Sequence, residues 1–112
     1  MNQKPLVYLA GPYSHPSPTV RQRRFEALNL AAGNLMRSGV LVFSPISHSH
    51  PIAEAGELPL GWDFWEQFDR AHLSNCHKVI VLMLDGWRDS KGVAAEIAIA
   101  EEMGLPVEFM EP

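Results

Sequence analysis

The chain has 112 residues, of which 46% are hydrophobic and 20% are charged. This length predicts a single domain spanning residues 1–112, and the composition excludes a disordered chain. A net charge of −4 argues against binding to a nucleic-acid duplex. The single cysteine, Cys76, excludes an internal disulfide and fits a reducing compartment. No apolar run approaches the ~20 residues needed to span a bilayer, so we expect a cytoplasmic protein without a membrane partner.

Hydrophobic periodicity predicts strands that alternate with helices along the chain. The expected strands are residues 6–10, 40–43, 78–84 and 105–109, and the expected helices are residues 18–37, 62–74 and 92–103. Residues 46–61, rich in His, Ser, Pro and Gly, are expected to form a long loop. This order predicts an α/β fold: a three-layer flavodoxin-like or Rossmann-like sandwich with a four- to five-stranded parallel sheet, order 2-1-3-4.

The order 2-1-3-4 places the first and third strands side by side, with the helices that follow them on opposite faces. Ligands of such sheets bind at the carboxyl ends of the strands, where the strand order reverses. The polar segments Gly11–Ser14 and Asp85–Ser90 follow these two strands. We therefore expect a crevice between these segments.

Glu96 is the first candidate for chemistry, because it lies among small apolar residues in the last helix. A carboxylate on the face that packs against the sheet, near the crevice, is a candidate nucleophile or general base. The alternative is an ordinary solvent-facing glutamate, as we expect Glu101 and Glu102 to be.

Asp69 is the second candidate. Helical spacing places it on one face with Trp65 and His72, which suggests a partly buried polar edge. A surface aspartate that pairs with Arg70 or Arg88 is the alternative.

The loops offer weaker signals. The segment Gly11–Ser14 contains neither a dinucleotide fingerprint nor a P-loop, although a phosphate could bind there with help from Ser14 and Arg21. Two histidines, His48 and His50, are too few for a zinc site, so no metal is expected. The remaining polar residues have ordinary alternatives as well: Asp85 suits a turn, Asp89 or Ser90 suits a helix cap, and Arg23 and Arg24 suit a solvated face.

Several of these segments together resemble the nucleoside 2-deoxyribosyltransferase-like superfamily, and in particular its short, uncharacterised branches. The segments are Leu9–Ser14 (LAGPYS), Phe43–Pro45, Asp69 shortly before the third strand, and the pattern of Asp, Ser, Gly, Glu and Ala residues from Asp85 to Val107. The resemblance covers nearly the whole chain. One departure is Lys91, which lengthens the usual turn by one residue.

The resemblance implies that Glu96 attacks C1′ of a deoxyribonucleoside or nucleotide, and that water or a second base then resolves the glycosyl-enzyme. It implies that Asp69 helps to protonate the leaving base, that no cofactor is needed, and that the chain forms a homo-oligomer. The alternatives are a non-catalytic nucleotide- or nucleoside-binding module and a protein whose polar loops serve an oligomer interface. The residues expected to bind substrate are Gly11, Pro12, Tyr13, Ser14, Arg21, Ser44, Pro45, Asp85, Trp87, Asp89 and Ser90.

Overall fold

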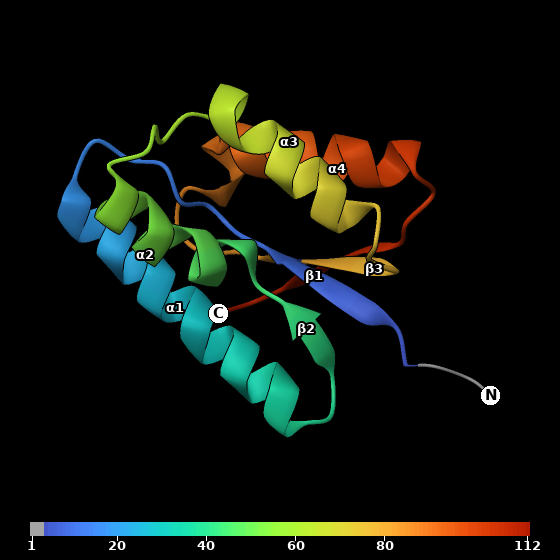
Figure 1. Ribbon diagram of the computed structural model, residues 1–112. Coiled ribbons are helices and arrows are strands. Elements are labelled where there is room, and N and C mark those ends of the chain that lie inside the picture. Colours follow the sequence, from blue (N-terminus) through green and yellow to red (C-terminus); the bar gives the residue numbers. More distant parts are fainter. Residues whose placement is uncertain (1–3) are drawn as a thin grey trace.

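The computed structural model describes residues 4–112 (Figure 1). Its elements are β1 (Leu6–Ala10), α1 (Pro18–Arg37), β2 (Leu41–Phe43), α2 (Pro45–Gly56), α3 (Trp62–Leu73), β3 (Lys78–Leu82), the short 3₁₀ turn η1 (Trp87–Asp89), α4 (Lys91–Glu102) and β4 (Val107–Met110). The four strands form one parallel sheet in the order β2-β1-β3-β4. The predicted α/β class and strand order are confirmed.

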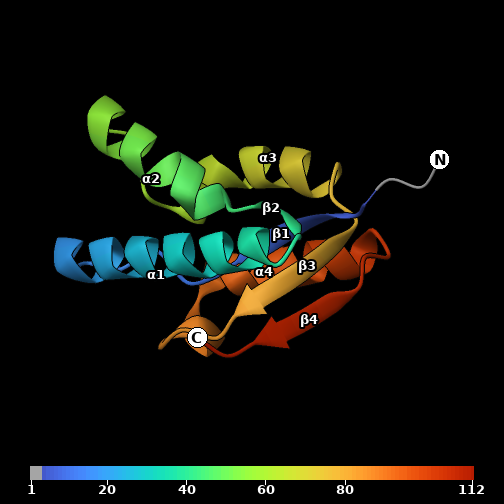
Figure 2. The ribbon, with the colours of Figure 1, turned by 90° about the horizontal axis from the view of Figure 1, so that it is seen from below.

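The sheet lies between two helical layers (Figures 1 and 2). Side chains alternate along a strand, so Val7 and Leu9 of β1 pack with α1, while Tyr8 and Ala10 face α3 and α4. The same alternation along β3 divides its buried residues between the two layers. Because both faces of the sheet are covered, these strands read in the sequence as continuous apolar runs.

Helix α1 begins as its sequence predicts. Ser17 is the N-cap, its hydroxyl oxygen accepts a bond from the Val20 amide at 3.4 Å, and Pro18 occupies the first turn. Beyond the C-terminal end of the helix, Gly39 adopts a left-handed φ of 95°, as a closing glycine does. Among residues 4–112, no helix is long and apolar enough to cross a membrane.

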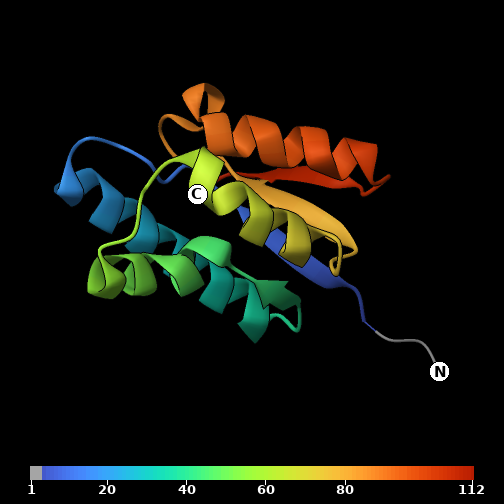
Figure 3. The same ribbon diagram turned by 45° about the horizontal axis from the view of Figure 1, so that its top comes forward.

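The expected loop 46–61 is wrong for most of its length, because residues Pro45–Gly56 form α2. Ser44 and Pro45, which directly follow the expected strand 40–43, are the N-cap residue and first turn of this helix. The helix forms despite Pro51 in its interior, since it packs along α1 (Figure 3). This tertiary contact outweighs the modest helix propensity of histidine and serine.

Smaller differences affect the ends of the strands. The strand β3 ends at Leu82, two residues earlier than expected, and the next two residues begin the turn. The strand β4 begins at Val107, since the Leu105 amide donates to the Ala100 carbonyl and so closes α4. These shifts leave the carboxyl ends of β1 and β3 at the expected edge of the sheet.

Candidate functional site

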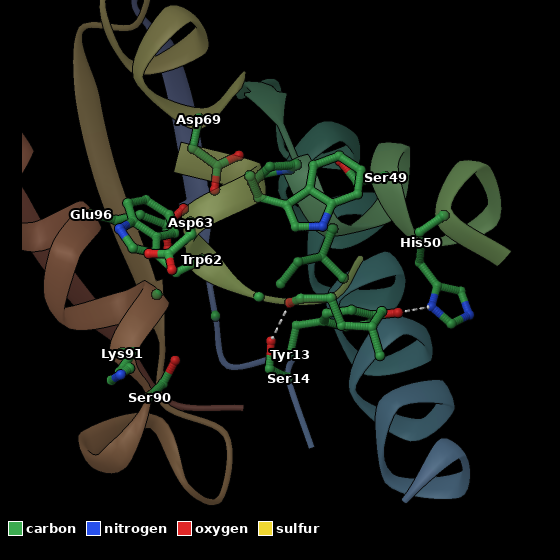
Figure 4. A pocket seen from close by; sticks show the side chains of 18 of the residues that line it. Tyr13, Ser14, Ser49, His50, Trp62, Asp63, Asp69, Ser90, Lys91 and Glu96 are labelled. Carbon is green, nitrogen blue, oxygen red and sulfur yellow. Dashed lines mark hydrogen bonds between the residues drawn. The ribbon is translucent and has the colours of Figure 1, made fainter. Parts of the chain in front are cut away.

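A cavity of about 670 Å³ lies where β1 and β3 end, at the predicted crevice (Figure 4). This volume suits a small-molecule ligand. It is bounded by the loop after β1, by α2 and α3 with their connection, and by the start of α4. The lining residues are Gly11, Tyr13, Ser14, Pro45, Ile46, Ser49, His50, Ala53, Leu60, Gly61, Trp62, Asp63, Trp65, Asp69, Asp89, Ser90, Lys91, Gly92 and Glu96.

Glu96 lies at the base of one end of this cavity. Its residue surface is only 5% exposed, because α4 presents it to the sheet. The hydroxyl of Tyr8, a fully buried residue of β1, donates a hydrogen bond to Glu96 Oε2. The alternative of a solvent-facing glutamate is therefore excluded for Glu96, whereas Glu101 and Glu102 are exposed as expected.

Asp69 extends from α3 toward the same end of the cavity (Figure 4), close enough to Tyr8 and Glu96 for both to affect the pKa of its carboxyl group. Burial raises the pKa of Asp69 from 3.8 to about 6, although hydrogen bonds with Tyr8 and Glu96 oppose that rise. Burial and then the charge of Asp69 raise the pKa of Glu96 well above its usual range. Each carboxyl group therefore keeps its proton to a higher pH than an isolated aspartate or glutamate does, and as close neighbours the two titrate as a pair.

Tyr8 is the hydrogen-bond donor to Glu96 at this end of the cavity. Burial and the two neighbouring carboxyl groups raise the pKa of its phenol well above 10.0, so the hydroxyl keeps its proton. A protonated phenol can stabilise the ionised form of Glu96 by its hydrogen bond. Tyr8, Asp69 and Glu96 thus form a buried acidic group, which we call the carboxyl end of the cavity.

The opposite end of the cavity is built from Tyr13 and His50. The Tyr13 hydroxyl lies 2.5 Å from His50 Nδ1, and His50 Nε2 lies 3.0 Å from Gln22 Oε1. Because the Gln22 amide nitrogen donates to Glu26, its oxygen must accept from His50. His50 therefore carries its proton on Nε2, and Nδ1 accepts the hydrogen of the Tyr13 hydroxyl. We call these linked residues the Tyr13–His50 chain.

Arg24 ties the two cavity loops together. Its guanidinium donates to the Ser14 carbonyl at 3.0 Å and to the Asp85 carbonyl at 3.2 Å. A side chain at Gly86 would meet this guanidinium, with a Cβ only 2.6 Å from Nη2. Arg24, expected on a solvated face, instead fixes the loops after β1 and β3.

Six of the eleven residues expected to bind substrate line the cavity: Gly11, Tyr13, Ser14, Pro45, Asp89 and Ser90. Ser90 is also the N-cap of α4, with its hydroxyl oxygen accepting from the Val93 amide at 3.2 Å. Lys91 is the first residue of that helix, so the extra residue extends α4 and does not enlarge the loop.

The other five, Pro12, Arg21, Ser44, Asp85 and Trp87, do not line the cavity. Arg21 donates to the His15 carbonyl at 2.5 Å. Ser44 bonds Ser47 through their hydroxyl groups at 2.7 Å, and Trp87 packs against Phe109. Trp65, Asp69 and His72 are all half-buried, as the predicted edge requires, and the ring of His72 stacks on Phe43 at 4.2 Å.

The family described as "Domain of unknown function (DUF1937)" matches residues 5–112. The chain belongs to this family. The comparison with curated proteins finds no match.

Three residues of this DUF1937 chain were missed as members of the site. Tyr8 was interpreted as part of an apolar strand, although a tyrosine in a buried strand needs a partner for its hydroxyl, which was an available signal. Asp63 and Arg24 gave no such signal, because isolated charges on helices are common.

Among the described residues 4–112, no three His, Cys, Asp or Glu side chains are arranged to hold a metal ion.

Proposed function

We propose that this protein cleaves the N-glycosidic bond of a nucleoside, deoxynucleoside or nucleoside monophosphate through a covalent glycosyl-Glu96 intermediate. Water or a second base would complete the reaction, giving hydrolysis or transfer. The observation that carries the proposal is the carboxyl end of the cavity: two buried carboxyl groups and a tyrosine at one point of a ligand-sized space. The resemblance to the nucleoside 2-deoxyribosyltransferase-like superfamily points the same way.

Glu96 is suited to attack an anomeric carbon. A carboxylate beside C1′ stabilises the positive charge that develops there, and bond formation to it divides one difficult step into two. The hydrogen bond from Tyr8 holds the carboxyl group in place and favours its ionised form. Burial keeps water away until the base has left.

A proton held by the pair supplies the acid. When it resides on Asp69, Glu96 is ionised and can form the bond to C1′. As the C1′–N bond breaks, its electrons go to the base nitrogen, and Asp69 delivers the proton there. In the second step Asp69, now ionised, takes a proton from the water or second base that attacks C1′, and Glu96 is released.

The rest of the cavity provides surfaces for the other parts of the substrate. Trp62 and Trp65 line it and offer flat rings on which a base can stack. Asp89 and Ser90 line the cavity at the start of α4, the helix that carries Glu96, and could bind a sugar hydroxyl. We propose that the chain also forms a homo-oligomer, which sedimentation equilibrium would test.

The decisive variant is Glu96→Gln, which keeps the shape of the side chain. With a panel of nucleosides and nucleoside monophosphates, we expect base release to fall by about 10³-fold or more. Glu101→Gln, an exposed residue on the same helix, is the matched control and should retain full activity. Intact mass after rapid mixing should reveal a glycosyl adduct on the wild type and none on Glu96→Gln.

The proposal fails if the wild type releases no base from any member of the panel, or if Glu96→Gln is as active as the wild type. A second candidate, a nucleoside-binding module without activity, is favoured by the burial of Glu96, which raises the pKa of its carboxyl group and so favours the form that is not nucleophilic. That candidate predicts micromolar binding of a nucleoside without release of its base.

A further inference from the structure

The cavity is lined by more negative than positive charge. Asp63 and Asp89 are exposed, Asp69 is half-buried and Glu96 is buried, and Lys91 is the one Lys or Arg among the described lining residues. Within residues 4–112, the salt bridges join Arg70 to Glu66 and Glu102, and Lys78 to Glu108. The four cavity carboxyl groups therefore have no cationic side-chain partner in the described chain.

The two arginines near the cavity lie outside it, although the charge of Arg21 acts on Tyr13 at the end away from Glu96. Arg24 is engaged with the carbonyl oxygens of the loops after β1 and β3, and Arg21 with the carbonyl of His15. Neither side chain lines the cavity. A phosphate group in the cavity would thus approach four carboxyl groups and find only Lys91, which is exposed, to pair with.

The same cavity has the features that hold an organic cation. The rings of Trp62 and Trp65 line it, and the Trp62 ring lies near Gly92 in the first turn of α4. A flat cation gains from the face of an indole and from nearby carboxylates at once. A metal ion fits less well, because the described residues 4–112 provide no cluster of three ligating side chains.

We propose that the preferred substrate is an N-glycoside whose base carries a positive charge, such as a ribosyl or deoxyribosyl pyridinium, and which lacks a 5′-phosphate. This inference rests on the proposed function for the reaction, but its charge preference can be measured by binding alone. Burial and then the charge of Asp69 raise the pKa of Glu96, which favours its protonated form. A cationic base beside it favours its ionised form, so the binding of substrate prepares the nucleophile and releases a proton to solvent.

A cationic base can leave from C1′ at this site without being protonated, unlike an uncharged base. Glu96 forms its bond to C1′ while the C1′–N bond breaks, and the electron pair of that bond neutralises the ring nitrogen. The base leaves uncharged and needs no proton. Asp69 is then free to accept the proton of the water that attacks C1′ and releases Glu96.

The test compares three compounds that share nearly one shape: the pyridinium nucleoside of nicotinamide, its uncharged dihydropyridine form and its 5′-monophosphate. Their Kd values are measured calorimetrically on Glu96→Gln, which prevents turnover, and kcat/KM for base release is measured on the wild type. We expect the cation to bind at least about tenfold more tightly than the uncharged form, and the monophosphate to bind more weakly than the nucleoside. The preference should shrink several-fold at high salt, because Asp63 and Asp89 are exposed.

A charge variant sharpens the result. Asp63→Asn should reduce the preference for the cation several-fold, whereas Glu101→Gln, an exposed residue outside the cavity, should leave it unchanged. Thermal shifts of the wild-type protein with the same three compounds give the ranking without any substitution in the site.

The inference is overturned if the uncharged form or the monophosphate binds as tightly as the cationic nucleoside. The two proposals fail separately. Glu96-dependent base release from uncharged nucleosides, without a preference for the cation, refutes the charge preference and keeps the proposed function. A strong preference for the cation in binding, with no base release from any compound, refutes the proposed function and keeps the charge preference.

Discussion

The carboxyl end of the cavity and the Tyr13–His50 chain are both polar groups in an apolar setting, but they are satisfied differently. The Tyr13–His50 chain passes hydrogen bonds from Tyr13 through His50 to Gln22 at the surface, so each donor has an acceptor. The carboxyl end has two acids with raised pKa values, and the Tyr8 hydroxyl donates to Glu96. Burial without compensation is costly for a carboxylate.

This difference indicates different roles. A satisfied chain of hydrogen bonds holds its members in one position and is suited to shaping a binding surface. Two carboxyl groups with raised pKa values can exchange a proton with a ligand near neutral pH, which is what a reacting group needs. The predictions below test this division of roles, and each uses a variant that changes one end only.

Asp69→Asn should have the largest effect. For substrates with an uncharged base, kcat should fall by about 10²- to 10⁴-fold, because the base then leaves without a proton. KM should change little, and the loss should be smaller for a cationic base. Steady-state kinetics of base release measure this, with Glu66→Gln, on the same helix but outside the cavity, as control. An unchanged kcat for all substrates would show that Asp69 donates no proton.

Stability should depend on pH through the same pair. Burial raises the pKa of Asp69 from 3.8 to about 6, and that of Glu96 well above its usual range. The folded protein therefore binds more protons than the unfolded chain above about pH 4, and the free energy of unfolding falls as the pH rises from 4 through 6. Asp69 accounts for a fall in the free energy of unfolding on the order of 1–3 kcal/mol over this pH range.

Urea unfolding at several pH values measures this dependence. Asp69→Asn should flatten the fall between pH 4 and 6, while Glu101→Gln, an exposed carboxyl group, should leave the curve as in the wild type. A stability that rises with pH over this window, beyond what the control explains, would contradict the burial of ionisable groups in this cavity.

Tyr8→Phe should have a smaller effect on activity. The substitution removes the one hydroxyl that donates to Glu96, so the pKa of Glu96 should rise further. The ascending limb of the pH profile of kcat/KM should move to higher pH, and kcat at neutral pH should fall about tenfold. A merely structural tyrosine would lower stability, by about 1 kcal/mol, and leave the pH profile in place.

Tyr13→Phe should have the smallest effect. It breaks the Tyr13–His50 chain but leaves the carboxyl end unchanged, so KM should rise by a few-fold and kcat should remain close to the wild-type value. The loss of one hydrogen bond should cost about 1 kcal/mol of stability. A large loss of kcat would place Tyr13 among the reacting groups and contradict the comparison of the two ends.

Much of the fold follows from local patterns. The apolar strands, the Ser17 cap with Pro18 and the closing Gly39 each obey rules that act over a few residues. Helix α2 does not, because its Ser, His and Pro residues favour no helix and it forms by packing along α1. Local patterns therefore predicted a loop where this helix forms.

The site divides in the same way. Glu96 and Asp69 could be chosen from the sequence, because each is a carboxylate on a helix face that also carries apolar residues. Their meeting at Tyr8 could not, since it depends on how α3 and α4 cross one face of the sheet. Arg24 was missed for a similar reason, because its partners are backbone carbonyls of loops that are distant in the sequence.

The sequence by itself determined the strand order, the edge of the sheet where a ligand would bind and the two candidate carboxylates. These depend on hydrophobic period, chain order and the handedness of crossovers, which are properties of the chain and its chirality. The tertiary structure alone decided that the two carboxyl groups lie close together away from solvent without a cation, that the pKa of each is raised, and that the lining of the cavity is acidic. Those properties depend on desolvation and on the distances between residues far apart in the chain, which no local pattern specifies.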